Sequence, residues 1–303
     1  MPADGRNAGR NNDRRAGRTQ DAKRHIAEMD ARFSNDIKRS LSELKVYDGA
    51  PAVKAEGCVP EVKVVDQDGA TTVLELGRGL ASACDMAILD FASFVNPGGG
   101  YDRGAWAQEE ALCSESTLFN VLREQKAWYG ENRRRNLNCE LYRNRGLVVP
   151  KVRFERENYH SYADVIVVAA PNARRARENY RVAEDTLVAT MRNRIRFVLA
   201  IADDLGHDKL VLGAYGCGVF GWDASVVAEL FRAELATGTH VAKQVIFAIP
   251  RARFDENLPR FEHAFAAFPE ANSSAYTKPV EKPKVEVKAV EDDEEEEDWR
   301  KYL

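Results

Sequence analysis

Two acidic residues follow closely behind a run of glycines in the first half of the chain. The run is Gly98, Gly99 and Gly100, and the sequence Gln108-Glu109-Glu110 comes after seven intervening residues. Glycine has no Cβ, so its backbone amides can approach the oxygens of a ligand closely. Successive helical residues point about 100° apart, so the two carboxylates would face such a ligand differently. The pattern therefore indicates that one acid holds a sugar hydroxyl while the other transfers a proton.

An ordinary structural explanation also fits these residues when they are considered alone. Glycine triplets occur in tight turns. Acidic residues in the first turn of a helix interact favourably with the helix dipole and are commonly solvated there. The local residues leave both explanations open.

A second glycine-rich loop, Gly216–Gly221, follows an apolar run and precedes a helical pattern. A helix N-terminus carries a partial positive charge of about half a unit, and amides there bind phosphate oxygens. The loop spells G-x-G-x-x-G, but it lies late in the chain and lacks an acidic ribose anchor about 20 residues further on at the end of a second strand. A dinucleotide dehydrogenase is therefore disfavoured. The lack of a G-K-[ST] motif excludes a P-loop kinase or GTPase.

Short apolar runs alternate with helical patterns along most of the chain. Such runs, when they end in small-residue loops, are typical of strands buried on both faces. We expect strands at 86–91, 146–154, 163–172, 209–215 and 244–249, and helices at 105–129, 182–205, 223–235 and 258–268. This alternation predicts an α/β layered fold in which both glycine loops lie at the carboxyl ends of strands.

Two further elements are expected nearer the N-terminus. Apolar residues recur at spacings of three and four between residues 19 and 45, which predicts one or two amphipathic helices. Residues 61–76 contain two β-rich runs on either side of Asp66–Gly69, where Asp-Gly favours a turn. We therefore expect a β-hairpin there.

The composition limits the class of protein. The chain has 303 residues, 44% of them hydrophobic, and its five cysteines and five histidines are scattered without a metal-binding motif. We therefore expect reduced thiols, no metal and no cofactor. No apolar run approaches the roughly 20 residues of a membrane helix, and the N-terminus lacks the apolar centre of a signal peptide. An intracellular protein, cytoplasmic or nuclear and with no membrane partner, is expected.

Both ends of the chain differ in composition from the middle. Residues 1–18 are small, polar and basic, and residues 269–303 form a Lys/Glu/Pro/Val-rich linker followed by an acidic tail. Both ends are predicted to be disordered. The net charge is −4, but residues 291–298 are all acidic, so the rest is mildly basic and suits an anionic ligand. A single monomeric domain is expected over 19–268, with a helical extension at 19–45.

The stretch NPGGGYDRGAWAQEEALCSESTLF resembles the signature of the poly(ADP-ribose) glycohydrolases, a glycine triplet followed after six to eight residues by Gln-Glu-Glu. Further segments resemble the short, bacterial-type (microbial) branch of that family in the family's order: LDFASFVNPGGG, AQEEALCSESTLF, VIVVAAPN and LVLGAYGCGVFGWD. The resemblance covers residues 21–268. It implies a macrodomain, which is a three-layer α/β/α fold with a mixed central sheet, here with an N-terminal helical extension.

The resemblance also implies an activity and the residues that perform it. The implied reaction is hydrolysis of ribose–ribose bonds in poly(ADP-ribose) from chain ends, which releases ADP-ribose and reverses ADP-ribosylation, as in the DNA damage response. Glu110 would be the catalytic acid and base, and Glu109 would bind ribose hydroxyls. Phe220 would press on the ribose beside the scissile bond. The implied substrate-binding residues are Asn96, Gly98, Gly99, Gly100, Gln108, Gly216, Gly218, Val219, Phe220 and Gly221.

Some features stay open at this stage. Trp222 and Ala224 depart from the family pattern, so the width of the diphosphate-binding loop is not fixed. Tyr101, Tyr215 and Trp222 are aromatic candidates for stacking on adenine. A non-catalytic reader of ADP-ribose shares the phosphate-binding features, and so does a hydrolase of mono-ADP-ribosylated protein. The basic N-terminus favours a polyanionic substrate.

Overall fold

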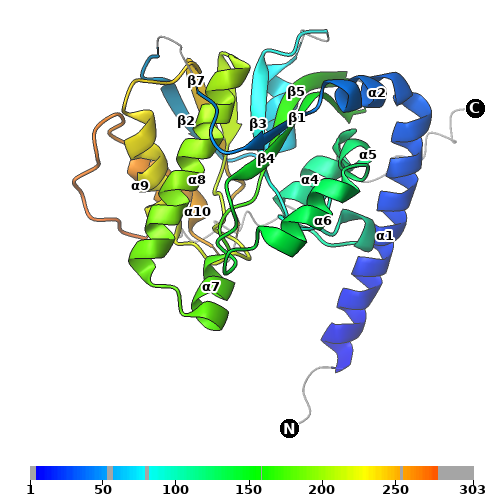
Figure 1. The fold of residues 1–303 in the computed structure, drawn as a ribbon, viewed down its shortest axis with the longest axis horizontal. Coiled ribbons are helices and arrows are strands. Elements are labelled where there is room, and N and C mark those ends of the chain that lie inside the picture. Colours follow the sequence, from blue (N-terminus) through cyan, green and yellow to red (C-terminus); the bar gives the residue numbers. More distant parts are fainter. Residues whose placement is uncertain (1–4, 53–56, 79–81, 158, 253–254, 279–303) are drawn as a thin grey trace, which may run out of the picture.

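The chain folds into a mixed sheet with helices on both of its faces (Figure 1). The computed structural model describes residues 5–52, 57–78, 82–157, 159–252 and 255–278. Within these residues the sheet has seven strands in the order β1-β4-β5-β3-β6-β7-β2. Their bounds are Lys45–Asp48 (β1), Glu61–Val65 (β2), Met86–Phe91 (β3), Arg145–Arg156 (β4), Tyr159–Val168 (β5), Lys209–Leu212 (β6) and Gln244–Ala248 (β7).

The central strands run parallel to one another. β3 pairs in parallel with both β5 and β6, and β7 pairs in parallel with β6 and β2. β4 is antiparallel to β5, and β1 is antiparallel to β4. Parallel strands buried on both faces have continuous apolar sequences. For this reason the strands expected at 86–91, 163–172, 209–215 and 244–249 are confirmed, although most of them end earlier than expected.

Alternate residues of the central strands point into two separate cores. Ala87 and Leu89 of β3 pack into one core, and Met86 and Ile88 pack into the other. The first core lies against α7 (Ala173–Tyr180), α8 (Glu184–Leu205), α9 (Ala224–Leu235) and α10 (Asn257–Phe265). The second lies against α1 (Gly5–Arg32), α2 (Ser34–Glu43), α3 (Gly69–Leu76), α4 (Gln108–Ser114), α5 (Leu118–Leu122) and α6 (Lys126–Arg135). The expected three-layer α/β/α fold is confirmed.

The hairpin expected over 61–76 is wrong in its second half. Residues Gly69–Leu76 form α3, while only Glu61–Val65 forms a strand. Asp68 is the N-cap of the helix, since its Oδ1 accepts a hydrogen bond from the amide of Thr71 at 2.8 Å. The strand β2 instead pairs with β7, which is distant in the sequence. A buried apolar helix face therefore imitated the pattern of a strand.

The single helix expected over 105–129 is also wrong, because the chain breaks into α4, α5 and α6. The first break is at Thr117, whose amide donates to the carbonyl of Arg153 in β4 at 3.0 Å. In return the amide of Arg153 donates to Oγ1 of Thr117 at 3.2 Å. The strand β1 and the helix α7 were not predicted. The helices expected at 182–205, 223–235 and 258–268 are confirmed with small shifts at their ends.

The N-terminal segment predicted to be disordered is helical from Gly5 onward, because α1 runs without interruption from Gly5 to Arg32. The side chain of Arg15 explains part of this order, since its Nε donates to the carbonyl of Arg103 at 2.9 Å. Further along the helix, Ala22 and Met29 are buried in the core. Residues 1–4 lie outside the described residues. The prediction considered apolar packing only and missed the bonds that arginines make to loop carbonyls.

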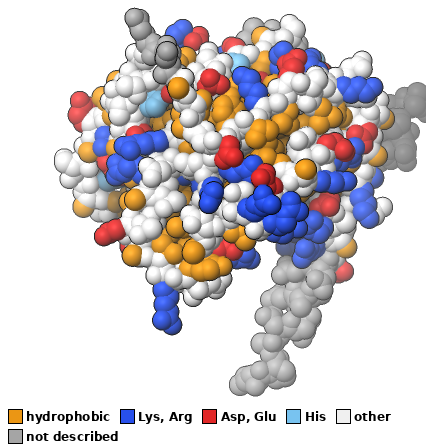
Figure 2. Space-filling model, in the orientation of Figure 1, with side chains coloured by type: hydrophobic (Ala, Val, Ile, Leu, Met, Phe, Trp, Pro, Cys, Tyr) orange, Lys and Arg blue, Asp and Glu red, His pale blue; other side chains and the backbone are white. Residues whose placement is uncertain are grey.

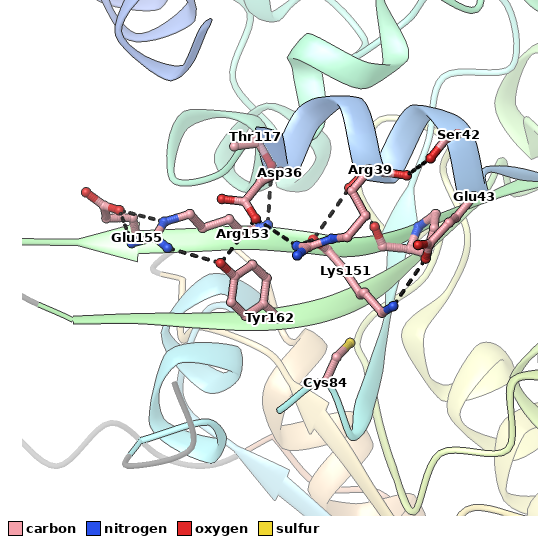
Figure 3. Close-up of polar contacts among 12 residues, drawn as sticks. Asp36, Arg39, Ser42, Glu43, Cys84, Thr117, Lys151, Arg153, Glu155 and Tyr162 are labelled. Carbon is pink, nitrogen blue, oxygen red and sulfur yellow. Dashed lines mark hydrogen bonds and ion pairs between the residues drawn. The ribbon is translucent and has the colours of Figure 1, made fainter. Parts of the chain in front are cut away.

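Helix α2 lies across β4, as Figure 3 shows. Its apolar contact is through Ile37, which is buried. Polar contacts flank it: Nζ of Lys151 lies 3.2 Å from Oε2 of Glu43, and the hydroxyl of Tyr162 donates to Oδ1 of Asp36 at 3.3 Å. Exposed ion pairs contribute only about 0–1 kcal/mol each. Apolar burial therefore holds the helix, and the polar contacts set its position along the strand.

The C-terminal linker is described as far as residue 278, so the disorder predicted for 269–303 is wrong for its first part. Nδ2 of Asn272 donates to the carbonyl of His263 at 2.8 Å, and the guanidinium of Arg260 lies 5.0 Å from the ring centre of Tyr276. Both contacts fix the linker to α10. The acidic run lies outside the described residues. Among the helices that the structure describes, none is long and apolar enough to span a membrane.

Candidate active site

The two glycine loops lie side by side because they follow neighbouring strands. Gly98–Gly100 follows β3 and Gly216–Gly221 follows β6, and these strands pair in parallel. The ring of Phe91, at the end of β3, lies 5.5 Å from the ring of Tyr215. A Cβ at Gly213 would lie 2.9 Å from Cζ of Phe91, so glycine is needed there for the close approach. The sequence placed both loops at one edge of the sheet, and the structure confirms it.

Gln108 attaches the first residue of α4 to the end of β3. Its Nε2 donates to the carbonyl of Leu89 at 2.9 Å, and its Oε1 accepts from the amide of Phe91 at 2.8 Å. These are the two bonds that a neighbouring strand would otherwise make. The helix itself begins without a side-chain cap at Ala107. Gln108, predicted to bind substrate, thus has both polar atoms of its side chain engaged in positioning the helix.

Glu109 and Glu110 are buried in the first turn of α4, with exposed fractions of 3% and 6%. Oε2 of Glu109 accepts from the amide of Ser93 at 2.7 Å. Oε1 of Glu110 accepts from the amide of Gly100 at 2.9 Å. The two acids therefore hold different parts of the loop that follows β3, as expected for neighbouring residues that point in different directions.

The glycine triplet packs directly against these carboxylates. A Cβ at Gly99 would lie 2.4 Å from Oε1 of Glu110 and 2.9 Å from Oε2 of Glu109. Gly99 also has a φ of +63°, which side chains other than glycine rarely adopt. Gly98, with φ of +59°, is closed off in the same way by the ring of Phe119 at 2.4 Å. Space and backbone conformation both require glycine at these positions.

A third carboxyl group, that of Asp90, accompanies the two acids and was missed in the sequence. Asp90 is 0% exposed, and neither of its carboxylate oxygens has a hydrogen-bond partner among the described residues. Burial raises the pKa of Asp90 well above its ordinary value, and the charge of Glu110 raises it further. The signal in the sequence was an aspartate inside MAILDF, which otherwise reads as a fully buried strand.

The pKa of Glu109 is also raised well above its ordinary value, first by burial and then by the charge of Asp90. The hydrogen bond from the amide of Ser93 acts in the opposite direction but does not cancel the shift. Buried carboxyl groups this close together do not all ionise, because each charge disfavours the next. We therefore expect the group of three acids to retain at least one proton near neutral pH.

The second loop presents backbone amides that no part of the described chain engages. The amides of Gly218, Val219 and Phe220 donate to no acceptor in that part of the chain. Val219 is 70% exposed. Behind these residues the loop is closed by a hydrogen bond from the amide of Gly221 to the carbonyl of Gly218 at 3.1 Å. Successive free amides of this kind form a concavity suited to anions such as phosphate.

Aromatic rings connect the two loops. Phe94, in the loop after β3, stacks on Tyr142 at a centroid distance of 4.5 Å, and Tyr142 meets Phe220 edge-on at 6.4 Å. The buried guanidinium of Arg194 donates to the carbonyl of Tyr142 at 3.1 Å and so fixes the middle ring. Tyr142 and Arg194 were not predicted. Their positions in the sequence carry no motif, because they act through packing between distant segments.

The three aromatic candidates for adenine stacking are all buried, which corrects that expectation. Tyr101, Tyr215 and Trp222 belong to the two cores and offer no exposed ring face in this structure. The hydroxyl of Tyr215 donates to the carbonyl of Val168 at 2.9 Å, and Nε1 of Trp222 donates to the carbonyl of Pro171 at 2.8 Å. These rings therefore pack in the cores beneath the two loops.

Helix α6 holds the segment that carries Asn96. Oδ1 of Asn96 accepts from Nη2 of Arg133 at 3.0 Å, and the same nitrogen donates to the carbonyl of Val95 at 2.9 Å. Nδ2 of Asn132 donates to the carbonyl of Phe94 at 3.0 Å. No acceptor within the described part of the chain meets Nδ2 of Asn96.

Helix α1 contacts the segment between the glycines and the acids. Nε of Arg15 donates to the carbonyl of Arg103, and Nε of Arg18 donates to the carbonyl of Gly104, both at 2.9 Å. A Cβ at Gly104 would lie 2.3 Å from the carbonyl oxygen of Arg15. The N-terminal helix thus shapes a loop that lies far from it in the sequence.

Fold and site together define a class: a macrodomain-type α/β/α protein with two glycine-rich loops at the carboxyl ends of adjacent strands and buried acids against the first of them. Comparisons with known proteins specify the family. Residues 19–157 match the family described as microbial-type PARG, catalytic domain, where PARG is poly(ADP-ribose) glycohydrolase. This match and the solved structures confirm the resemblance to microbial-type poly(ADP-ribose) glycohydrolases that the motifs indicated.

Solved structures agree with this assignment. The chain is similar to the poly(ADP-ribose) glycohydrolase of Thermomonospora curvata, with 27% identity, a TM-score of 0.69, and coverage of 82% of this chain and 98% of that one. A structure of the same protein bound to the inhibitor ADP-HPD has 26% identity and a TM-score of 0.67, with coverage of 82% of this chain and 97% of that one. The poly(ADP-ribose) glycohydrolase of Deinococcus radiodurans in complex with ADP-ribose has 28% identity and a TM-score of 0.64, with coverage of 75% of this chain and 95% of that one. A search of curated proteins returned no match.

Proposed function

We propose that this chain hydrolyses the ribose–ribose O-glycosidic bonds of poly(ADP-ribose) from chain ends and releases ADP-ribose. The observation that carries the proposal is the contact of Gly99 with the buried carboxylates of Glu109 and Glu110, beside a loop with free amides. The match of residues 19–157 to the microbial-type poly(ADP-ribose) glycohydrolase catalytic domain supports it. The D. radiodurans relative was solved with ADP-ribose bound, which supports the same ligand here.

Glu110 acts in this proposal as general acid and then as general base. In its protonated form it gives the proton to the departing 2′-oxygen while the glycosidic C–O bond breaks through an oxocarbenium-like state. The carboxylate then takes a proton from water as the water oxygen bonds to the anomeric carbon. Glu110 ends the cycle protonated, as it began. Its Oε1 is held by the amide of Gly100, which leaves Oε2 to carry the proton.

Glu109 binds the ribose hydroxyls. Its Oε2 is held by the amide of Ser93, and its buried Oε1 has no partner within the described residues, so this oxygen is available to a hydroxyl donor. Asp90 interacts electrostatically with both acids, and its raised pKa keeps a proton within the group of three. A hydroxyl that enters the site supplies the hydrogen bond that Glu109 lacks, which favours bound substrate.

The second loop positions the diphosphate. The free amides of Gly218, Val219 and Phe220 would donate to its oxygens, with no side chain in the way at Gly218. Phe220 is held by Tyr142 and would press on the ribose next to the scissile bond. Positioning of this kind is worth several kcal/mol of the barrier, because it replaces a search in solution by a fixed approach.

A polymeric substrate is supported by the surface around the site. Lys and Arg side chains gather where α1 meets the body of the protein (Figure 2). Trp106, in the segment between the glycines and the acids, is 60% exposed and offers a face for a base. Within the proposal the protein acts inside the cell, as a monomer, on poly(ADP-ribose) or on ADP-ribosylated protein.

The proposal is tested by incubating the purified protein with auto-modified polymer and measuring free ADP-ribose. Glu110→Gln is expected to lower the rate by a factor on the order of 10² to 10⁴, the range for loss of a general acid–base. Glu109→Gln is expected to weaken binding and lower the rate as well. The matched control is Glu124→Gln, a change at an exposed acid that pairs with Arg123.

Calorimetry with ADP-ribose separates the remaining functions. Retained binding by Glu110→Gln together with lost turnover supports the proposal, because folding and the phosphate site are then intact. Full activity of Glu110→Gln contradicts the assigned role. Binding without turnover in the unmodified chain would make it a reader. Release from mono-ADP-ribosylated protein but not from polymer would make it a mono-ADP-ribosyl hydrolase.

A further inference from the structure

A second group of reactive side chains lies at the opposite edge of the sheet from the glycine loops. Cys84 comes two residues before β3, and His207 comes two residues before β6. Asp164 lies in β5 opposite Ala87, the second residue of β3. Because β5, β3 and β6 are adjacent and parallel, the segments just before β3 and β6 lie beside the middle of β5, and the three side chains come together there. Each residue of β3 advances about 3.3 Å, so roughly 15–20 Å separates this group from the glycine loops.

The distances within this group resemble those between ligands of one metal ion. The thiol, carboxylate and imidazole ligand atoms all lie within 4.8 Å of one another. Nε2 of His207 is 2.9 Å from Oδ2 of Asp164, and Sγ of Cys84 is 3.3 Å from Oδ1. In a tetrahedral zinc site with ordinary bond lengths, the N···O and S···O separations are about 3.3 Å and about 3.5 Å. Small rotations of these side chains would be enough to admit the ion.

The types of ligand select zinc. A thiolate and an imidazole suit a borderline-soft divalent ion, and one carboxylate completes a mixed set that zinc accepts. A backbone hydrogen bond also fixes the orientation of the carboxylate, since the amide of Lys151 donates to Oδ1 of Asp164 at 2.8 Å. Lys151 sits at an irregular point of β4, which frees its amide from the regular ladder. Figure 3 shows the thiol of Cys84 pointing towards the strands beside Lys151.

We propose that Cys84, Asp164 and His207 bind one Zn²⁺ ion, with water at the fourth position. The thiol releases its proton to solvent as the Zn–S bond forms, so the chain gains one thiolate ligand. The ion joins the middle of β5 to the segments just before β3 and β6, and it stabilises the sheet at the end remote from the acids. This inference does not depend on the proposed hydrolase activity. No sequence motif indicates this site, because Cys84 and His207 lie 80 and 43 residues away from Asp164.

The chain contains a matched comparison. Nδ1 of His240 lies 2.9 Å from Oδ2 of Asp203, which is the same separation as between His207 and Asp164. Among the described residues, three potential metal ligands come together in the Cys84 group and not around this pair. A histidine–aspartate contact without a thiol is therefore available as a control on the same molecule.

The test uses the full chain after removal of metals with a chelator. Titration with Co²⁺ is expected to give one bound ion per chain and a thiolate-to-cobalt absorption band in the near ultraviolet, and Zn²⁺ is expected to displace it. Calorimetry with Zn²⁺ should then show one site, and Zn²⁺ should raise the thermal midpoint. Cys84→Ser should abolish the band, and both Cys84→Ser and His207→Gln should weaken Zn²⁺ binding at least about tenfold.

Two controls make the result specific to this group. His240→Gln and Cys139→Ser, the latter at an exposed thiol elsewhere in the chain, should bind Zn²⁺ like the unmodified protein. The inference is overturned if the stripped chain gives no thiolate band. It is equally overturned if Zn²⁺ binds with unchanged affinity to both Cys84→Ser and His207→Gln. Circular dichroism of each variant verifies that a lost band does not come from a lost fold.

Discussion

Gly99 and Gly218, one in each glycine-rich loop, are glycine for different physical reasons. At Gly99 the space beside the backbone is already filled, because a Cβ would lie 2.4 Å from Oε1 of Glu110. At Gly218 a Cβ would meet nothing within 4 Å. The first loop is fitted closely to the acids of the chain itself, whereas the second keeps its amides open to a ligand. A run of glycines can therefore mark either a tight internal fit or room for a partner.

Among changes to the glycines of the two loops, the largest effect is expected from Gly99→Ala. The added methyl group forces the carboxylate of Glu110 to move, and the φ of +63° adds backbone strain. A displacement of about 1 Å at a reacting group can cost on the order of 100-fold in rate. We expect a loss of that size in release of ADP-ribose from polymer. Stopped-time assays of product release measure it.

The control for this change is Gly206→Ala. Gly206 has a φ of +73° at the end of α8, and a Cβ added there would meet nothing within 4 Å. This variant bears the same kind of backbone strain without touching the acids, so it should lose stability and keep its rate. Equal loss of rate in both variants would mean that strain, and not contact with Glu110, explains the result.

Gly218→Ala is expected to have a smaller and different effect. The methyl group meets no protein atom, so the thermal midpoint should stay unchanged. If the amides of this loop bind a diphosphate, the methyl group hinders that approach, and ADP-ribose should bind about tenfold more weakly, which is about 1.4 kcal/mol. Calorimetry and thermal unfolding measure the two quantities. Unchanged affinity would remove the distinction between the loops.

A further effect concerns stability and its dependence on pH. The pKa of Asp90 is raised in the folded state, first by burial and then by the charge of Glu110. The folded state therefore holds this proton more tightly than the unfolded state, and the stability it contributes is lost as pH rises through the raised value. Asp90→Asn lacks this group, so its free energy of unfolding should fall less steeply with rising pH, by up to about 1.4 kcal/mol per pH unit.

Urea unfolding between about pH 5 and about pH 8 measures the difference. The free energy of unfolding of the unmodified chain should fall more steeply with rising pH than that of Asp90→Asn. Asp208→Asn is the matched control, because Asp208 forms an exposed ion pair with Lys243. Parallel curves for the unmodified chain and Asp90→Asn would show that Asp90 titrates alike in the folded and unfolded states.

Much of the central sheet could be predicted because buried parallel strands carry their own signal. The run MAILDF and its equivalents in β5, β6 and β7 are apolar on both faces, and this pattern needs no knowledge of the partner strand. The segment at 69–76 failed for the opposite reason. Its residues are apolar enough for a strand, and only the capping bond from the amide of Thr71 to Asp68 shows that it starts a helix.

The site was predictable where chemistry is concentrated in a short motif. The glycine triplet and the two acids lie within 13 residues, from 98 to 110, and the structure brings them into contact. Asp90, Tyr142 and Arg194 were missed because their roles depend on what lies around them in space. The three aromatic candidates failed similarly, since an aromatic residue next to a glycine loop can as well face the core.

The two bonds of Gln108 to β3 have a consequence for variation in length. They hold the first turn of α4, and with it Glu109 and Glu110, directly against the sheet and not through the intervening segment 101–107. We therefore expect the acids to keep their place when residues are inserted in this segment, provided that Tyr101 stays in the core and α1 still binds the carbonyls of Arg103 and Gly104. The number of residues between the glycines and the acids can then vary, while their positions in space are set by the strand.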